Sequence, residues 1–507
     1  MTFMKILLIN PPRTYFQGSK GVRLGLPLGL MYIAAVLEEN GCAVKIFDSL
    51  ISEKTEIIEK DNFLYHGVSE DYFKDVVSRE EPALVGIGGP FSAQIHNAVR
   101  AADLVKQINP NIFVVIGGPH ASVKGADFLK ENKNIDAAVV GEGELAMLEL
   151  AKAIKDKRSL KAISNVVYRF SDNQEREEKI FTNPWTVIKK IDELPLPAYH
   201  LMDMERYFFL SYDLSARPTK YNRSISMITS RGCPYNCVFC SIHLHMGRIW
   251  RFHSVEYVVN HIERVISDYK VKHISFEDDN FTFNPRRCER ILDEVLTKKI
   301  KFSWDTPNGV RVDTLNEKLL KKMKKSGCQE LIIGTESGSQ EVLDKIINKN
   351  LRLENVFKIA QLCRKIKIKL RSFFVIGFPG ETKKDIQKTI DFAFALYKEY
   401  RVRPNLMIAT PLFGTRLYEI SQKENFLVKN ITSKDLALAT QARGFGLIET
   451  SDFTPEDLKK FARELEAKIS RLDLIRKLSN PKEYFKILKL IFKKPDRVIH
   501  YLKRILN

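Results

Sequence analysis

The sequence predicts an α/β protein: an N-terminal doubly wound parallel sheet, then a partial (β/α)6 barrel of the TIM type, then a helical C-terminal region. Two observations predict this. In the first 150 residues, short apolar runs typical of parallel strands alternate with segments of helical spacing. From residue 224 the same alternation resumes over six units, which indicates an incomplete parallel barrel. The expected divisions are listed here in chain order: a Rossmann-like domain over 1–155, a connector over 156–220, the partial barrel over 221–430 and a basic helical region over 431–507.

Five strands are expected in the N-terminal sheet, at 5–9, 42–47, 83–87, 112–116 and 137–140. Helical patterns at 28–39 and 93–108 lie between them, and the first ends at Asn40-Gly41, a typical helix stop. Each strand leads into a turn rich in glycine or proline, at the edge where such sheets bind ligands. None of these turns carries the dinucleotide fingerprint or a phosphate loop. A nucleotide is therefore not the expected occupant.

The connector is predicted to hold an edge hairpin, formed by 163–170 and 179–182, and a proline-stiffened linker at 191–199. The barrel strands are expected at 224–229, 273–277, 302–304, 330–334, 370–376 and 406–409. Helices are expected between them at 255–268, 286–298, 317–325, 353–365 and 383–397.

Composition indicates a soluble protein of a reducing compartment. Of the 507 residues, 44% are hydrophobic and 28% are charged, as in ordinary globular proteins. No secretory signal is recognised, and no window reaches the roughly 18 apolar residues of a membrane span. Four of the seven cysteines lie singly in apolar patterns and are expected to be buried and unpaired: Cys42, Cys288, Cys328 and Cys363. We therefore expect a cytoplasmic protein.

The formal net charge of +19 is partly concentrated at the C-terminus. Residues 474–507 hold ten Lys or Arg and two acidic residues, interleaved with apolar side chains, which predicts a basic amphipathic helix. Such a helix either packs its apolar face on the body of the protein or lies on an anionic membrane surface. Both interpretations stay open, so the expected location is cytoplasmic with peripheral membrane contact as an alternative.

Three cysteines lie on one short loop, Cys233, Cys237 and Cys240, directly after the first barrel strand. Three thiolates can hold three corners of a four-iron cluster and leave the fourth iron open for a chelating ligand. The spacing also suits a zinc knuckle completed by His243, His245 or His253, or a redox-active thiol cluster.

Acidic segments follow three other barrel strands and would lie at the same mouth: 276–281, 334–339 and 376–381. Carboxylates there could bind the ammonium and hydroxyl groups of a cationic ligand. The alternative is that they cap helix N-termini, a position that Asp and Glu favour.

Taken together, these motifs resemble the radical S-adenosylmethionine superfamily. The resemblance rests on the cysteine loop with Phe239 and on the segments 276–281, 334–339 and 376–380. The N-terminal half resembles the cobalamin-binding domain that one large subgroup carries, through 26–38, 115–122, 140–144 and 194–198. Together these resemblances cover roughly residues 1–430.

The resemblance implies three cofactors: a [4Fe–4S] cluster held by the three cysteines, S-adenosylmethionine, and cobalamin. The residues that it implies for S-adenosylmethionine are Phe239, Asp278, Asp279, Glu336, Ile376 and Gly377. Those that it implies for cobalamin are Asn10, Gly88, Gly89, Gly118, His120, Gly141, Glu142 and Gly143. The motif Asp-x-His-x-x-Gly, which supplies a lower axial histidine, is missing, and His120 lacks that context. No further catalytic residue can be named.

The implied function is a cobalamin-dependent radical enzyme that methylates an unactivated carbon or phosphorus through a 5′-deoxyadenosyl radical and methylcobalamin. One alternative is a radical cyclase or oxidoreductase without methyl transfer. Another is a metal-stabilised module that binds RNA through the basic surface, although no RNA-binding motif is present and no nucleic-acid partner is expected. The expected partners are a small-molecule or lipid-like substrate and a reductase or flavodoxin-type electron donor.

Overall fold

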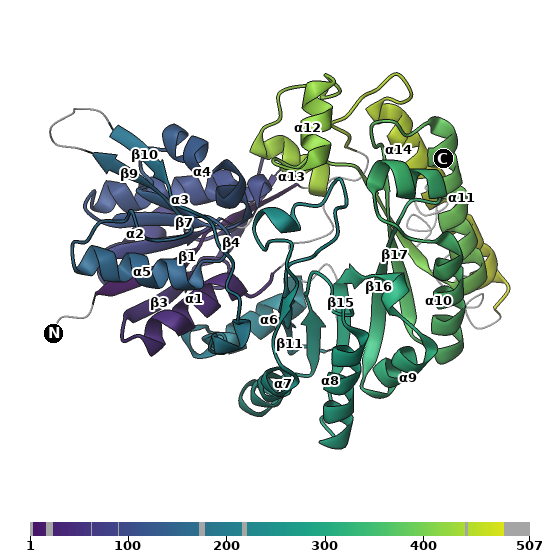
Figure 1. Ribbon diagram of the computed structural model, residues 1–507, viewed down its shortest axis with the longest axis horizontal. Coiled ribbons are helices and arrows are strands. Elements are labelled where there is room, and N and C mark those ends of the chain that lie inside the picture. The colour runs from purple at the N-terminus through teal and green to yellow at the C-terminus, as the bar shows by residue number, and fades with distance from the viewer. Residues whose placement is uncertain are drawn as a thin grey trace, which may run out of the picture.

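Two parallel sheets, each with its own helices, lie side by side in the computed structural model of the protein (Figure 1). The structure describes residues 4–16, 24–61, 63–89, 91–171, 178–214, 221–441 and 445–480. The first sheet has the strand order β10-β9-β8-β7-β6-β1-β3, and the second has the order β11-β14-β15-β16-β17-β18. The predicted α/β architecture is confirmed.

The first sheet contains the five predicted parallel strands: β1 (Lys5–Asn10), β3 (Ala43–Asp48), β6 (Leu84–Gly88), β7 (Phe113–Gly117) and β8 (Ala137–Val139). The predicted hairpin, β9 (Val166–Ser171) and β10 (Glu178–Thr182), extends this sheet beside β8 in antiparallel pairing. Helices cover both faces: α1 (Leu28–Glu39), α2 (Glu70–Glu80), α3 (Ile95–Ile108), α4 (Pro119–Glu131) and α5 (Glu144–Lys155). Two separate apolar clusters result, one on each face of the sheet.

A small antiparallel sheet was not predicted. It consists of β2 (Arg13–Phe16), β4 (Glu56–Lys60) and β5 (Phe63–Gly67), in the order β2-β5-β4. All five residues of β4 are exposed. Because neither face of this strand is buried, its sequence lacks the alternation of apolar and polar residues that identifies a half-buried strand.

The second sheet forms the predicted partial barrel, with all neighbouring strands parallel. Its strands are β11 (Ser224–Met227), β14 (His273–Phe276), β15 (Ser303–Val310), β16 (Cys328–Glu336), β17 (Lys369–Ile376) and β18 (Arg403–Ile408). Its outer helices are α7 (Val255–Tyr269), α8 (Pro285–Thr297), α9 (Glu317–Lys325), α10 (Leu353–Ile366) and α11 (Lys383–Tyr400). In the part of the chain that the structure describes, β11 and β18 do not pair, so the barrel is open.

Strand β15 is much longer than the predicted 302–304, because it continues through Pro307 and Gly309. Both residue types normally interrupt a strand, and here the register with β16 shifts between Thr306 and Val310. The irregularity lets the strand continue to the barrel mouth despite residues that indicate a break.

The C-terminal helices contact both halves of the molecule. Helix α13 (Ser433–Gln441) packs against β2 and the 3-10 turn η1 (Ser92–Gln94), which belong to the N-terminal half. Helix α14 (Pro455–Leu478) packs against α11 on the outside of the barrel (Figure 1). Most of the predicted basic helix, from residue 481 onward, lies outside the described residues. Among the helices described, none combines the length and apolarity needed to span a bilayer.

The four cysteines that were expected to be buried and unpaired have free thiols, and only Cys42 among them is partly exposed. The two halves share one core, because Leu26, Leu28 and Met31 belong to the same apolar cluster as the barrel. Polar contacts also cross this interface: the hydroxyl of Tyr199 lies 3.0 Å from Nε2 of His261 on α7.

We expect the interface histidine His261 to make stability depend on pH. His261 is 1% exposed, and burial lowers its pKa to about 3 from the ordinary 6.5. As pH falls below 6.5, the unfolded chain takes up a proton that the folded chain refuses, so the free energy of unfolding decreases. One such group contributes at most about 1.4 kcal/mol per pH unit.

The variant His261→Gln keeps a hydrogen-bonding partner for Tyr199 but cannot titrate. Urea unfolding between about pH 7 and about pH 5 should therefore show a smaller loss of stability in the variant than in the natural protein. Equal pH slopes for both proteins would contradict this account.

Candidate functional site

The cysteine loop lies at the mouth of the barrel, directly after β11 and the short strand β12 (Ser230–Arg231). The thiols of Cys233, Cys237 and Cys240 are free and partly exposed. The backbone holds them in place: Cys240 donates to the carbonyl of Cys237 at 3.1 Å, and Cys233 donates to that of Gly247 at 3.4 Å. This position, at the carboxyl end of the first barrel strand, is the predicted one.

One predicted alternative for the cysteine loop was a zinc knuckle completed by a nearby histidine. Among the described residues, no group of three or more His, Cys, Asp or Glu side chains is arranged to hold a single metal ion. His253 faces elsewhere, because its Nδ1 lies 3.2 Å from Asp192 and its ring stacks on Tyr257. In a four-iron cluster each thiolate binds a different iron, so the sulfur atoms stand apart.

The electrostatics at the loop also fit such a cluster. Burial raises the pKa of all three thiols, to about 12 at Cys240, so the metal-free loop holds neutral thiols. Lys349 and Arg311 lie near enough to counteract this effect at Cys237. The guanidinium of Arg311 also lies 3.8 Å from the ring centre of Tyr235 on the same loop. These two cations would offset the negative charge of thiolates bound to iron.

The carboxylate of Asp278 braces the start of the loop. It accepts hydrogen bonds from the amide and hydroxyl of Thr229, each at 2.7 Å, and from the hydroxyl of Ser230 at 2.6 Å. The residue is 1% exposed. Both oxygens of Asp278 are therefore engaged within the protein, and its predicted contact with S-adenosylmethionine stays a prediction.

Asp279 differs from its neighbour. One of its oxygens accepts a hydrogen bond from the amide of Gly232 at 2.9 Å. Burial raises the pKa of Asp279 to about 6, against the effect of this hydrogen bond. A cationic group placed beside this carboxylate would favour its charged form.

Glu336 ends β16 in a left-handed backbone conformation, with φ of 67°, and pairs with Nζ of Lys349 at 2.6 Å. Both side chains are 8% exposed. The predicted residue is therefore at the mouth, but it already has a cationic partner that a ligand would have to share.

The turn after β17 contains the predicted residues Ile376 and Gly377. Its phenylalanine, Phe378, lies 5.8 Å from Phe239 of the cysteine loop between ring centres, so this turn and the loop are adjacent. Glu381, which was not among the predicted site residues, accepts hydrogen bonds from the amides of Gly377 at 2.7 Å and Phe378 at 3.1 Å. The sequence signal that could have identified Glu381 was its position four residues after Gly377, in a turn with two glycines, where a carboxylate can accept hydrogen bonds from backbone amides.

On the N-terminal sheet, the predicted glycines lie in turns at the carboxyl edge, where a Cβ at Gly88 would lie 3.5 Å from Leu30 and one at Gly89 would lie 3.3 Å from Ile95. Gly89 donates to the carbonyl of Gly117 at 2.6 Å. A Cβ at Gly118, whose φ is +127°, would lie 2.2 Å from the oxygen of Gly89, so only glycine fits there. Gly88 ends β6 at the same edge. Asn10 is different, because it is 3% exposed and donates to Asp48 at 2.9 Å, which makes it part of the core.

His120 lies at the start of α4, with Nδ1 2.8 Å from the hydroxyl of Ser92. Its ring contacts Phe413, from the segment after the last barrel strand, at 6.2 Å between centres. Burial lowers the pKa of His120 to about 4, so it is neutral near pH 7. His120 therefore faces the boundary between the two halves of the molecule.

The turn 141–144 carries a buried ionic contact between the halves, which the sequence did not reveal. Glu142 pairs with Arg231 at 2.8 Å and with Arg251 at 2.5 Å, and Glu144 pairs with Arg231 at 2.7 Å. All four side chains are at most 5% exposed. Arg251 belongs to β13 (Arg251–Phe252), which pairs with β12 beside the cysteine loop. We call these four residues the ion-pair network.

The network engages Glu142, whose predicted contact with cobalamin stays a prediction. Its Oε2 also accepts a hydrogen bond from the amide of Ile188 at 2.8 Å, so its carboxylate is occupied by protein groups rather than exposed to a ligand. Gly141 is required by packing, because a Cβ there would lie 1.9 Å from Nε1 of Trp185. A Cβ at Gly143 would lie 2.9 Å from Cδ1 of Ile33 on α1, so this position also leaves little room for a side chain.

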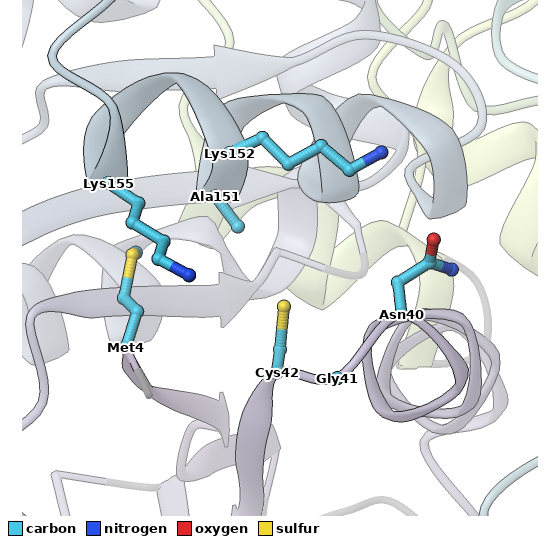
Figure 2. Close-up of a pocket in the computed structure, with 7 residues that line it drawn as sticks. All are labelled: Met4, Asn40, Gly41, Cys42, Ala151, Lys152 and Lys155. Carbon is cyan, nitrogen blue, oxygen red and sulfur yellow. The ribbon is translucent and has the colours of Figure 1, made fainter. Parts of the chain in front are cut away.

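A shallow depression lies at the other edge of the first sheet, where its strands begin (Figure 2). The residues that line it are Met4, Asn40, Gly41, Cys42, Ala151, Lys152 and Lys155. Parallel sheets of this type bind ligands at the carboxyl ends of their strands. The depression is therefore not part of the candidate site.

We expect the variant Glu142→Gln to be strongly destabilising, because it leaves the buried guanidinium of Arg251 without a charge partner and that of Arg231 with Glu144 alone. The free energy of unfolding should fall by about 3 kcal/mol in urea titrations of the metal-free protein. The control Glu149→Gln removes an exposed pair with Lys152 and should cost less than about 0.5 kcal/mol. Equal effects of the two substitutions would show that the network does not stabilise the interface.

Comparison with known proteins identifies two family domains. Residues 227–393 match the radical SAM superfamily, and residues 22–151 match the B12 binding domain. The uncharacterized methyltransferase PH0819 of Pyrococcus horikoshii is 33% identical over 467 residues, covering 92% of each chain. The cytidylyl-2-hydroxyethylphosphonate methyltransferase of Streptomyces wedmorensis is 29% identical over 517 residues, covering 95% of this chain and 93% of that one.

Among solved structures, the cobalamin-dependent S-adenosylmethionine radical enzyme OxsB with aqua-cobalamin and S-adenosylmethionine bound has a TM-score of 0.70. It shares 16% identity and covers 99% of this chain and 72% of its own. TsrM from Kitasatospora setae, with cobalamin and a [4Fe–4S] cluster bound, has a TM-score of 0.66 and 17% identity, over 85% and 80% of the chains. These likenesses show a shared fold. With its two family domains and a relative at 33% identity over nearly its whole length, the chain belongs to the radical S-adenosylmethionine superfamily, in the subgroup with an N-terminal cobalamin-binding domain.

Proposed function

We propose that the protein is a cobalamin-dependent radical S-adenosylmethionine methyltransferase that acts on an unactivated carbon or phosphorus atom of a small-molecule or lipid-like substrate. The observation that carries the proposal is the junction of the halves. The loop with three cysteines is tied by the ion-pair network to the β8–α5 turn of the B12-binding domain. Relatives named as methyltransferases, which match over nine-tenths of the chain, support the same reading.

In this proposal Cys233, Cys237 and Cys240 hold three irons of a [4Fe–4S] cluster and leave the fourth for S-adenosylmethionine. When bound, the cluster supplies the electron that cleaves S-adenosylmethionine, and cobalamin supplies the methyl carrier. The contribution of the chain is to hold these groups in register and to keep water out. Asp278 serves this end by fixing Thr229 and Ser230, immediately before the loop.

For S-adenosylmethionine we propose Asp279 as the partner of the methionyl ammonium, because one of its oxygens has no hydrogen-bonding partner among the contacts described. Glu336, shared with Lys349, would accept a hydrogen bond from the ribose or the amino group. Phe239 and the turn at Ile376-Gly377 would contact the adenine. Glu381 holds this turn through two backbone amides, so its role is positioning.

For cobalamin we propose the turns that contain Gly88, Gly89 and Gly118, at the carboxyl edge of the first sheet, where parallel sheets of this type bind ligands. His120 flanks this edge, and its Nδ1 is already engaged by Ser92. The Asp-x-His-x-x-Gly motif that supplies a lower axial histidine is missing from the sequence, and the ring of His120 packs against Phe128 and Phe413. The proposal therefore assigns His120 to packing at the edge of the site.

A radical cyclase is the second candidate, because a relative carries that activity in its name. The anaerobic magnesium-protoporphyrin IX monomethyl ester cyclase of Rubrivivax gelatinosus is 25% identical over 77% of this chain and 65% of its own length. Stoichiometry separates the two candidates. Methyl transfer consumes a second S-adenosylmethionine and yields S-adenosylhomocysteine, whereas ring formation through a radical alone yields none.

A cytoplasmic location fits unpaired cysteines and an oxygen-sensitive cluster. We propose a flavodoxin-type reductant as the electron source. Peripheral membrane contact through 474–507 stays a proposal that rests on the charge of that segment.

The first test concerns the cluster. Anaerobically reconstituted protein should bind about four irons, absorb broadly in the visible region and form 5′-deoxyadenosine when reduced. Each of Cys233→Ala, Cys237→Ala and Cys240→Ala should lose this product while keeping the circular dichroism of the folded protein. The control Cys42→Ala, in the distant depression, should keep both cluster and product. Turnover by any of the three loop variants would refute the assignment.

The second test concerns Asp279. The variant Asp279→Asn keeps the shape of the side chain but removes the charge from the proposed ammonium contact. Because a charge-assisted hydrogen bond is worth about 1.5–3 kcal/mol, we expect KM for S-adenosylmethionine to rise roughly tenfold or more, with kcat changed less. Initial rates of 5′-deoxyadenosine formation measure both constants. The exposed control Asp127→Asn should leave them unaltered, and an unchanged KM in Asp279→Asn would remove this residue from the site.

A further inference from the structure

A group of exposed and half-buried apolar side chains lies beside the cysteine loop, and the chemistry described so far does not use it. Ile249 is 64% exposed and Phe252 is 46% exposed, although both are large and apolar. The rings of Trp250 and Phe252 lie 4.8 Å apart, and Trp250 lies 5.0 Å from Phe283. We call these four residues the aromatic patch. Exposed patches of this kind usually mark interaction surfaces.

The patch is in direct contact with the loop that carries the cysteines. The carbonyl oxygen of Ile249 lies so close to Gly232 that a Cβ there would be 2.4 Å from it, and Gly232 immediately precedes Cys233. Tyr235, inside the cysteine loop, packs edge-on against Phe283 at 6.0 Å. A protein seated on the patch would therefore lie a few side chains from the cluster, and electron transfer weakens steeply with distance.

The charge around the patch selects the kind of partner. Residues 232–252 contain no acidic residue, and Arg248 among them is exposed. Arg287 lies 5.4 Å from the ring centre of Phe252, but it is 5% exposed and donates to the carbonyls of His253 and Thr229, so it lies beneath the patch. On the same helix Arg286 and Arg290 are exposed, and with Arg248 they supply the positive charge that a partner can reach. Glu289 is occupied by Lys318 and Lys322. An apolar centre with a basic rim is complementary to an acidic protein.

Charge also disfavours one competing occupant, the C-terminal segment of this same chain. Residues 481–507 carry eight Lys or Arg against two acidic residues, a net charge of +6. Placing that segment on a basic surface would bring like charges together, which costs free energy.

We propose, on the basis of the function proposed above, that the aromatic patch is the docking surface of an acidic, low-potential flavodoxin. One electron leaves the reduced flavin of the partner and enters the [4Fe–4S] cluster. The flavin is oxidised by one electron and the cluster is reduced by one electron, with no atom transferred. Weak redox complexes typically bury small interfaces, which a patch of this size can provide.

The first measurement is binding, which does not require turnover. Purified oxidised flavodoxin, titrated calorimetrically into the holoprotein, should bind Ile249→Glu at least about tenfold more weakly, because the variant places a negative charge on an apolar contact facing an acidic partner. The matched control Ile58→Glu changes an isoleucine of β4 that is 52% exposed and should bind normally. Binding by the natural protein should weaken with added salt, and Arg248→Glu should reduce both affinity and salt dependence. Unchanged affinity in Ile249→Glu overturns the proposal.

The second measurement compares two reductants in 5′-deoxyadenosine formation. With flavodoxin and its reductase, Ile249→Glu should be at least about tenfold slower than the natural protein at subsaturating flavodoxin. With dithionite, which needs no docking surface, both proteins should have equal rates. An equal loss with both reductants overturns the docking assignment, because it places Ile249 in the active site or the fold.

Other occupants give different results. Co-sedimentation with phosphatidylglycerol vesicles that Ile249→Glu abolishes would assign the patch to a membrane and overturn the proposal. A concentration-dependent dimer that the same variant dissociates would assign it to a second copy of the chain and would overturn it too. Failure of the natural protein to cleave S-adenosylmethionine with dithionite would refute the proposed function, whereas the docking assignment is decided separately by the flavodoxin titration.

Discussion

The buried ion-pair network constrains the rest of the site. A buried ion pair is a poor way to gain stability, because desolvation of both charges offsets most of their attraction. The network constrains geometry more than it adds stability. Glu142 must contact Arg231 and Arg251 at once, at 2.8 and 2.5 Å, in a region closed to water. Very few relative placements of the two halves satisfy this demand. The network therefore fixes the cysteine loop relative to the glycine edge of the first sheet, which is the relationship that a two-cofactor reaction needs.

The sequence was a good guide to elements that repeat a pattern. Most of the five parallel strands of the first sheet and the six of the barrel are buried runs that alternate with amphipathic helices, so they are visible locally; β18, which has no buried residue, was recognised by its place in the alternation. The cysteine loop was equally clear, because Cys233, Cys237 and Cys240 lie within eight consecutive residues. Strand β4 was missed because it buries neither face, and the length of β15 was underestimated because Pro307 and Gly309 suggest an end that the irregular register avoids.

The functions of individual polar residues could not be predicted, because their partners are remote in sequence. Glu142 lies 89 residues before Arg231 and 109 before Arg251, and no local signal connects them. Asp278 and Asp279 are neighbours of the same chemical type, yet one braces Thr229 and Ser230 while the other meets only the amide of Gly232 among the contacts described. Such differences depend on which way a side chain points in the folded chain. Composition and spacing do not contain that information.

The ribbon of β12 and β13 shows how one small element can serve two sides of the molecule. Neighbouring residues on a strand point to opposite faces. In this ribbon Arg231 is directly opposite Arg251, and both point toward the B12-binding domain, where they join the network. Ser230 is directly opposite Phe252, and this second pair faces Asp278 on one strand and the aromatic patch on the other. A two-residue pairing therefore separates the contacts that fix the domains from those of Ser230, which is 1% exposed, and of Phe252, which is 46% exposed. Because the cysteine loop begins immediately after this ribbon, a partner on the outer face would approach the cluster without disturbing the ion pairs on the inner face.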